Sequence, residues 1–432
     1  MLENIFYNLL FYFKMNIKQK YIIGIIIALI IIFVTEIFYR RPLYDFSVEY
    51  ISKIRQSGFF HNFYIFWAKY FNQIINYTGI FCTILFCPLN TFFSHLSSQY
   101  ILDFVNGIFK SLYSNERPFW DIYIDVDNTK FNKYTNQTLT KLTECNTSFG
   151  NPSGHAMRAT YTLILWNLLI NSKYFNKLPA KKKIIIKYYT LVLSMLGIFF
   201  VLYSRINRQA HSFNQIIFGT LIGIAIFFIL CYIVEINKLE PDGFCLILDK
   251  YKFYVIPSFL VLYVISIVLG LARHNPKEEY YKNLLVKICK SNAEKLFGRQ
   301  KVDSASIIFI FLGAYIGLLY LNYNIKKKYN NNLERFYNWN KNGILQITIV
   351  LAFNFGFSFS HLWIVKMFYD FNIAAKLIFS IIINSIIGFL AFGFYFYHLF
   401  DIFLLSKEDV EIDSLTKSLE DEIEKGYEQT IN

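Results

Sequence analysis

The sequence predicts an all-α polytopic membrane protein, and three observations carry this prediction. The 432 residues are 55% hydrophobic and only 17% charged, with a mean hydropathy of +0.35, which is too apolar for an ordinary soluble domain. About ten apolar runs approach the roughly 20 residues that a helix needs to cross the hydrocarbon core. Lys and Arg residues gather in short clusters between these runs, as in the loops that flank membrane helices.

The first apolar run, "YIIGIIIALIIIFVTEIFY", is too long for a signal-peptide core and lacks a small-residue cleavage site, so it is interpreted as an anchor that stays. The second helix has the least certain limits, because residues 59–71 are also aromatic and apolar. The expected membrane helices lie near residues 21–39, 74–94, 97–113, 155–172, 184–204, 211–235, 253–272, 305–323, 344–366 and 376–405.

The basic loops predict the orientation in the membrane. The flank "KMNIKQK" and the loop 173–187 are rich in Lys and are expected in the cytoplasm. Alternation of ten helices then places both termini in the cytoplasm and the loop 114–154 on the far side. The loop 273–304 is also basic and argues the other way, but long loops follow the rule less closely. The sequons at Asn136 and Asn146 lie in the far-side loop, where glycosylation is possible.

Charge and cysteine content exclude two other classes of function. The net charge of +13 comes from basic residues between apolar runs, so a basic cytoplasmic flank explains it better than nucleic-acid binding. The six cysteines include no CxxC pair, and no metal-site spacing is present. Cys145 and Cys289 lie in polar segments on the same predicted side, so a disulfide between them stays open.

Three polar clusters at the ends of predicted helices fall on one side of the membrane. The cluster "KSLYSNERP" closes the third helix with Lys110 and Arg117. The cluster "PSGH", residues 152–155, opens the fourth helix. The cluster "SRINRQAHSFNQ" puts Arg205 at the end of the fifth helix and His211 at the start of the sixth.

Each cluster alone has a structural explanation. Lys110 can reach the interface, Arg117 can be a topology charge, and PSGH can be a turn with a capping serine. Together, however, they put cations and two histidines at one membrane depth, which is costly unless the groups are paired or functional. Arginine forks, a lysine and backbone N–H groups match the oxygens of a phosphoryl group. Two histidines provide a nucleophile and a proton donor for a displacement without metal.

The order KxxxxxxRP, PSGH, SRxxxxxH resembles the signature of the type 2 phosphatidic acid phosphatase (PAP2) and vanadium haloperoxidase superfamily, over about residues 110–215. The resemblance implies a PAP2-type helical bundle. It also implies that His211 is the nucleophile, forming a phosphohistidine, and that His155 is the general acid. The residues that would then hold the phosphoryl oxygens are Lys110, Arg117, Ser153, Gly154 and Arg205.

One position departs from the usual pattern of that superfamily. Four residues after the nucleophile, where Asp is usual, this chain has Gln215, which can accept the imidazole N–H and orient the ring but brings no charge. The glucose-6-phosphatase branch is similar in this feature, in "RPFW" and in "PSGHAM" after a sequon-bearing loop. Arg158 and the helix at 21–39 are unlike that branch.

The resemblance favours a metal-independent phosphomonoesterase without cofactor, acting on glucose 6-phosphate or a similar sugar phosphate. The alternatives are a phosphatase of phosphatidate or sphingosine phosphate, and an inactive, transporter-like or lipid-binding relative. A haloperoxidase fits less well, because those enzymes are soluble. The expected partners are the substrate and the lipid bilayer, without nucleic acid, and the oligomeric state stays open.

The predicted organisation has four parts. Residues 1–40 form a cytoplasmic N-terminus with an additional membrane helix, and residues 41–250 form the catalytic core. Residues 251–406 supply further membrane helices, and residues 407–432 form an acidic cytoplasmic tail. The expected location is the endoplasmic reticulum membrane, with the active site facing the lumen.

Overall fold

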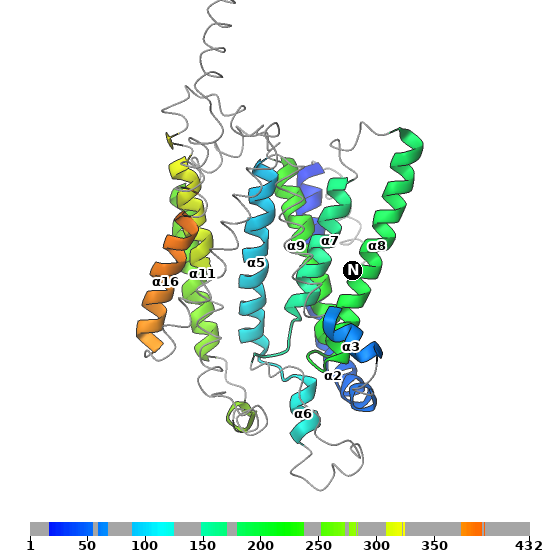
Figure 1. Ribbon diagram of the computed structural model, residues 1–432. Helices are drawn as coiled ribbons and strands as arrows, with labels where there is room; N and C mark the ends of the chain where they lie inside the picture. Colours follow the sequence, from blue (N-terminus) through cyan, green and yellow to red (C-terminus); the bar gives the residue numbers. More distant parts are fainter. Residues whose placement is uncertain are drawn as a thin grey trace, which may run out of the picture.

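The computed structural model describes residues 17–54, 59–67, 89–124, 148–170, 179–236, 252–272, 276–281, 283, 308–321, 323–324, 373–390 and 393. Within these residues the regular structure is helical, in agreement with the predicted all-α class (Figure 1). The helices are α2 (Ile17–Lys53), α3 (Phe59–Phe66), α5 (Leu89–Tyr113), α6 (Pro118–Ile124), α7 (Gly154–Ile170), α8 (Ala180–Asn207), α9 (Phe213–Ile236), α11 (Lys252–Ala272), residues 308–321 and α16 (Ile373–Phe389).

Long apolar helices indicate an integral membrane protein. Three described segments are long and apolar enough to cross a membrane, namely Ile23–Lys53, Lys181–Asn207 and Lys252–Leu269. Large apolar side chains such as Phe199 and Phe253 are exposed on these helices, where lipid would cover them. Contact with the bilayer expected from the composition therefore explains why these apolar side chains are exposed on the protein surface.

The count of ten helices is only partly open to comparison. The expected helix at 344–366 and residues 74–88 of the second expected helix lie outside the described residues, as do Asn136, Asn146, Cys145 and Cys289. The expected break between residues 94 and 97 is wrong, because α5 runs through it without interruption. Polar residues at this point are buried against the rest of the bundle: His95 and Ser98 are both inaccessible, and His95 stacks on Tyr161 of α7.

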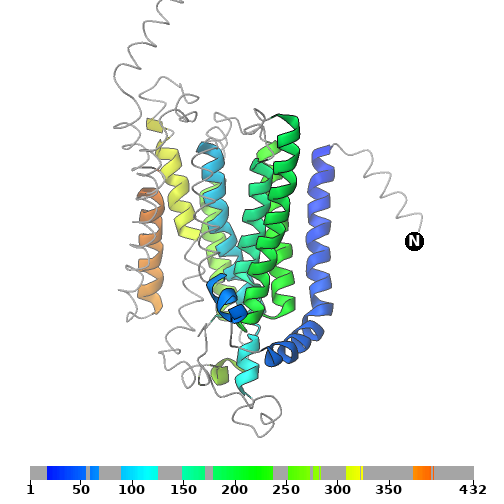
Figure 2. The same ribbon diagram turned by 45° about the vertical axis from the view of Figure 1, so that its right-hand side comes forward.

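Helix α2 is longer than expected and changes direction near its lower end (Figure 2). Pro42 lies inside it and removes one backbone hydrogen bond, which is a common cause of a helix bend. The boundary drawn at residue 40 thus falls inside one continuous helix. Phe33 packs edge-on against Phe218, with ring centroids 5.7 Å apart, so α2 lies against α9.

Close helix packing joins α7 to α9 and brings the second and third polar clusters together. An added Cβ at Gly219 would lie 2.5 Å from the Ser153 carbonyl oxygen, and one at Gly223 would lie 2.5 Å from that of Met157. Only glycine allows this approach, in the small-xxx-small pattern of membrane helix pairs. Around this contact, a buried apolar cluster joins α5, α7 and α9: Leu102, Met157, Tyr161, Phe218, Ile222, Ile226 and Phe227.

The helices after residue 250 pack on the other side of α5. Tyr263 of α11 meets Phe309 at a ring-centroid distance of 4.6 Å, and both belong to a buried cluster with Phe104 of α5. Between α5 and α7, Arg158 forms an ion pair with Asp103. A charge inside an apolar bundle requires such a partner, so Arg158 has a structural explanation.

Candidate active site

The three polar clusters meet at one end of the helix bundle. Lys110 lies in the last turn of α5, and Arg117 lies in the link between α5 and α6. His155 is in the first turn of α7, Arg205 is near the end of α8, and His211 lies two residues before α9. His211 is therefore in a loop, not at the start of the sixth helix as expected.

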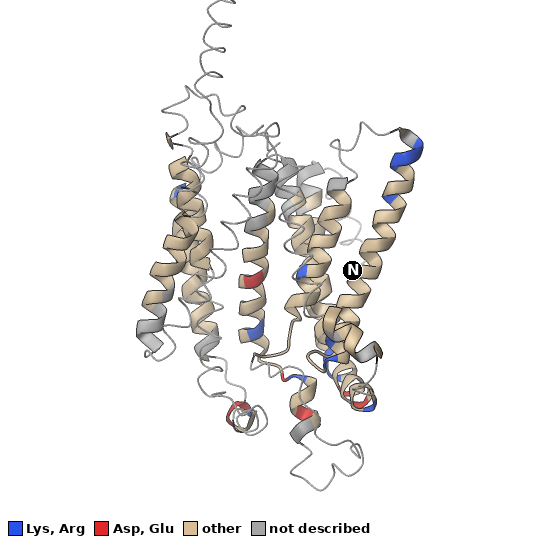
Figure 3. Ribbon diagram, in the orientation of Figure 1, with Lys and Arg blue, Asp and Glu red and all other residues tan. Residues whose placement is uncertain are grey.

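Basic residues also mark the opposite end of the bundle, at the start of α8, where Lys181, Lys182 and Lys183 lie (Figure 3). Arg205, near the other end of the same helix, belongs to the candidate site. The candidate site and the basic stretch that was expected in the cytoplasm thus lie at opposite ends of one long helix.

Arg117 is the centre of the hydrogen-bond network. Its side chain is completely buried. The guanidinium donates from Nη1 to the Ala210 carbonyl oxygen at 2.7 Å, from Nη2 to Ser148 Oγ at 2.6 Å, and from Nε to the Ser148 carbonyl oxygen. Its Nη1 also lies 3.3 Å from His211 Nε2. The planar fork is thereby held rigidly between two loops.

The contacts of His211 define its tautomer. A guanidinium can only donate, so His211 Nε2 must present a lone pair to Arg117. The proton is then on Nδ1, which lies 2.9 Å from the Gly150 carbonyl oxygen and 3.2 Å from Gln215 Oε1. The ring is consequently neutral, and its Nε2 lone pair accepts from Arg117.

Burial and neighbouring cations also favour the neutral ring. His211 is 2% exposed. Loss of hydration lowers the pKa of His211 well below 6.5, and the charges of Arg117, Arg205 and Lys110 lower it further. The same groups that suit a phosphate dianion therefore keep the imidazole unprotonated.

The lowered pKa of His211 predicts that stability in detergent falls with acidification. Below pH 6.5 the unfolded chain binds a proton that the folded site does not, so the contribution is complete above pH 6.5 and is lost as the pH falls toward the folded pKa. One group contributes at most about 1.4 kcal/mol per pH unit. Thermal unfolding should show a smaller loss between pH 6.5 and 5.5 for His211→Gln than for the unmodified protein. Equal losses would contradict this assignment.

Gln215 is held by three polar contacts. Its Oε1 faces His211 Nδ1 and accepts from the Ser212 N–H at 3.3 Å, while its Nε2 donates to the Glu116 carbonyl oxygen at 2.7 Å. A carboxylate has no donor for the last of these contacts. An amide therefore suits this position, because it can receive from His211 and donate to Glu116 at once.

The remaining cations surround His155 and Lys110. Lys110 Nζ donates to Ser148 Oγ at 3.3 Å, next to Arg117. The charges that act on His155 are those of Arg205, Lys110, Arg208 and Arg117. Arg208 was not among the candidates from the sequence, although it lies within the quoted third cluster. Four cations are therefore near enough to His155 to act on its charge.

The PSGH segment is fixed by its backbone. The Ser153 N–H donates to the Gln215 carbonyl oxygen at 3.0 Å, and the Ser153 carbonyl accepts from Met157 at 3.1 Å. Ser153 Oγ is buried and has no hydrogen-bond partner among the described residues. Gly154 begins α7, so its N–H lies at a helix N-terminus. These are groups that a bound anion would satisfy.

Sequence reasoning missed the residues that act through backbone atoms or through short side chains. Ser148 binds both Lys110 and Arg117, and the Gly150 carbonyl orients His211. A carbonyl oxygen is present in every residue, so no sequence pattern marks it. Within the described residues, no group of three or more His, Cys, Asp or Glu side chains forms a metal-binding cluster.

Comparison with known proteins supports the class that the motifs suggested. The model of the PAP2 superfamily matches residues 89–238, a segment that runs from α5 to the end of α9 and includes all three polar clusters. Members of this superfamily are phosphatases of phosphate esters. Searches of curated proteins and of solved structures found no match. The match thus supports the superfamily resemblance over residues 89–238.

Proposed function

We propose that the protein is a membrane-embedded phosphomonoesterase that works through a phosphohistidine on His211 without a metal ion. The observation that carries this proposal is the position of His211 Nε2, 3.3 Å from Arg117 Nη1. A phosphoryl oxygen that accepts from Nη1 in place of Nε2 frees the Nε2 lone pair and brings its phosphorus atom close to that nitrogen.

In the first step His211 Nε2 attacks phosphorus, and the bond from phosphorus to the leaving oxygen breaks. Lys110, Arg117 and Arg205 neutralise the phosphoryl oxygens, with Ser153 Oγ and the N–H of Gly154 as further donors. His155 protonates the leaving oxygen. The two negative charges of a bound phosphomonoester favour the protonated form of His155 that this step needs.

In the second step His155 takes a proton from water, and the resulting hydroxide attacks phosphorus as the bond to Nε2 breaks. The products are an alcohol and inorganic phosphate, so atoms and charges balance over the cycle. Throughout, the Gly150 carbonyl and Gln215 Oε1 hold the Nδ1–H, which keeps Nε2 as the reacting nitrogen.

For the substrate, we favour glucose 6-phosphate or a similar sugar phosphate. Gln215, the "RPFW" sequence and "PSGHAM" are the features shared with the glucose-6-phosphatase branch. The alternative is a lipid phosphate, which the same cations would bind. The proposed location is the endoplasmic reticulum membrane, with the site in the lumen, because the basic start of α8 lies at the other end of the bundle.

Phosphate release by the purified protein tests this function. We expect hydrolysis of glucose 6-phosphate to exceed that of phosphatidate and sphingosine phosphate, to survive a chelator and to be inhibited by vanadate, which mimics the transferring phosphoryl group. A His211→Ala preparation measures contaminating phosphatases. Preferred hydrolysis of a lipid phosphate would change the substrate class, loss of activity with the chelator would overturn the metal-free scheme, and no hydrolysis at all would contradict the function.

A further inference from the structure

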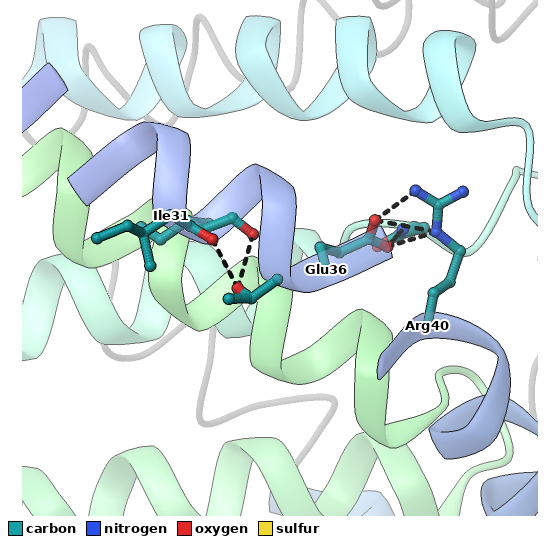
Figure 4. Close-up of polar contacts among 6 residues, drawn as sticks. Ile31, Glu36 and Arg40 are labelled. Carbon is teal, nitrogen blue, oxygen red and sulfur yellow. Dashed lines mark hydrogen bonds and ion pairs between the residues drawn. The ribbon is translucent and has the colours of Figure 1, made fainter. Parts of the chain in front are cut away.

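Helix α2 lies outside the segment matched to the superfamily, yet it contacts the first and third polar clusters and the residue that directly precedes the second. Its most unusual residue is Glu36, a carboxylate that is completely buried. Glu36 forms a bidentate ion pair with Arg40 one turn later (Figure 4). It also accepts a hydrogen bond from Asn151 Nδ2 at 3.0 Å. A buried charge is costly, so this partnership calls for a reason.

Asn151 lies at a critical point of the candidate site. It directly follows Gly150, whose carbonyl oxygen faces His211 Nδ1, and it directly precedes the PSGH segment. The Gly150 N–H donates to the Asn115 carbonyl oxygen at 2.8 Å, so the Gly150 peptide is held from one side by the first cluster. The Glu36 carboxylate holds the same loop from the other side through Asn151.

A second contact from α2 reaches the loop of His211. Ser47 Oγ accepts the N–H of Phe213 at 2.8 Å, which is one of the unpaired donors at the start of α9. This is an N-cap supplied by another helix, only two residues after His211. Helix α2 therefore holds His211 in two ways. Ser47 fixes the loop that contains His211, and Glu36 fixes the loop whose Gly150 carbonyl orients the imidazole ring.

A third set of contacts reaches the cluster that contains Arg117. Arg41 Nη1 lies 3.5 Å from Glu116 Oε1. Tyr44 donates to Asp121 Oδ2 at 2.8 Å, and Tyr44 is almost completely buried. Arg40, the partner of Glu36, lies over the ring of Tyr113 at 4.5 Å from its centroid, which ties Glu36 to the end of α5.

We propose that Glu36 is a positioning residue for phosphoryl transfer, acting through Asn151 on the Gly150 carbonyl and thereby on the His211 ring. This inference rests on the proposed function. The carboxylate is suited to the task because Oε1 accepts from both Asn151 Nδ2 and Arg40 Nε while Oε2 accepts from Arg40 Nη2. An amide would put an NH2 group, which cannot accept, in the place of one of these oxygens. Loss of the Glu36 carboxylate leaves the Gly150 carbonyl free to turn away from His211 Nδ1. The imidazole ring is then no longer held with Nε2 directed at the phosphorus atom.

The test compares Glu36→Ala, Glu36→Gln, Asn151→Ala and the double variant Glu36→Ala/Asn151→Ala. The matched control is Glu49→Ala. Glu49 is an exposed carboxylate of the same helix and forms an ion pair with Lys53, one turn further along α2. Rates are expressed per active site, counted from the amplitude of rapid phosphoenzyme formation. Misfolded protein then lowers the amplitude, whereas loss of positioning lowers the rate constant of phosphoenzyme formation.

Glu36→Ala is expected to lower this rate constant about tenfold with KM changed less than about twofold, because the ring is misaligned while the cations that bind phosphate remain. Glu36→Gln, which keeps one acceptor, should lose only about threefold. The double variant should be no slower than the slower single variant, because both changes interrupt one route. Glu49→Ala should behave as the unmodified protein.

Three outcomes would overturn the inference, and they are distinguishable. If the unmodified protein hydrolyses no phosphate ester, the proposed function fails and this inference fails with it. If it is active but the rate constant of Glu36→Gln equals that of Glu49→Ala, the positioning role alone is wrong. If the losses of Glu36→Ala and Asn151→Ala multiply in the double variant, Glu36 does not act through Asn151. Glu36→Gln decides the question should Glu36→Ala fail to fold.

Discussion

Replacing His211 with alanine is expected to abolish the phosphoenzyme and to lower kcat by at least about a thousandfold, because covalent catalysis loses its nucleophile. His155, at the start of α7, is assigned to proton transfer and is not expected to take over the role of nucleophile. The measurement is acid-labile radiolabel retained by denatured protein after mixing with labelled substrate.

A matched control is available in the same bundle. His95 is a buried histidine of α5, stacked on Tyr161 with ring centroids 6.3 Å apart, and its ring nitrogens have no hydrogen-bond partner among the described residues. His95→Phe, similar in volume, should retain labelling and activity. Added imidazole should partly restore turnover to His211→Gly by entering the space of the lost ring. Acid-labile label on His211→Ala would remove His211 from the role of nucleophile.

The second large effect is expected for Arg117→Lys, which keeps the charge but loses the fork. The guanidinium holds Ser148, Ala210 and His211 at once, and a single ammonium group cannot reach all three. We expect kcat/KM to fall by about a hundredfold to a thousandfold, the range typical of losing a preorganised donor to the developing charge. Inhibition by vanadate should weaken in parallel, because vanadate uses the same oxygen-binding groups.

Arg41→Lys is the control for this prediction. Arg41 is 70% exposed, pairs with Asp45 on the surface of α2 and lies 3.5 Å from Glu116. Lysine keeps the charge that both contacts need, so the same chemical change there should leave kcat/KM within about twofold. Arg117→Lys with nearly unchanged kcat/KM and vanadate inhibition would show that the guanidinium geometry does not contribute to phosphoryl binding. The proposed use of Arg117 would then be wrong, although its structural role in joining the loops would stand.

Much of the fold was predictable, because apolar length and charge placement are local properties of the sequence. The limits of α7 and α11 agree with the expected runs to within two residues. The break expected before residue 97 failed because polar residues can be buried between helices as well as exposed in a loop, and hydropathy does not separate these cases. Gly219 and Gly223 lie four residues apart, a spacing that predicts close packing of membrane helices. Hydropathy alone does not detect this spacing.

The sequence by itself indicated an all-α membrane protein similar to one superfamily, and it marked most of the charged and histidine side chains of the candidate site. Charged and histidine side chains at the ends of apolar helices are costly in a membrane, so their positions stand out, and their spacing resembles one superfamily. Only the tertiary structure decided how these side chains are aimed. The tautomer of His211 depends on the Gly150 carbonyl and Arg117, and the Gly150 loop depends on Glu36, which lies 115 residues from its partner Asn151. Backbone carbonyls carry no sequence signature, and a contact between distant helices is set by packing, which no local pattern records.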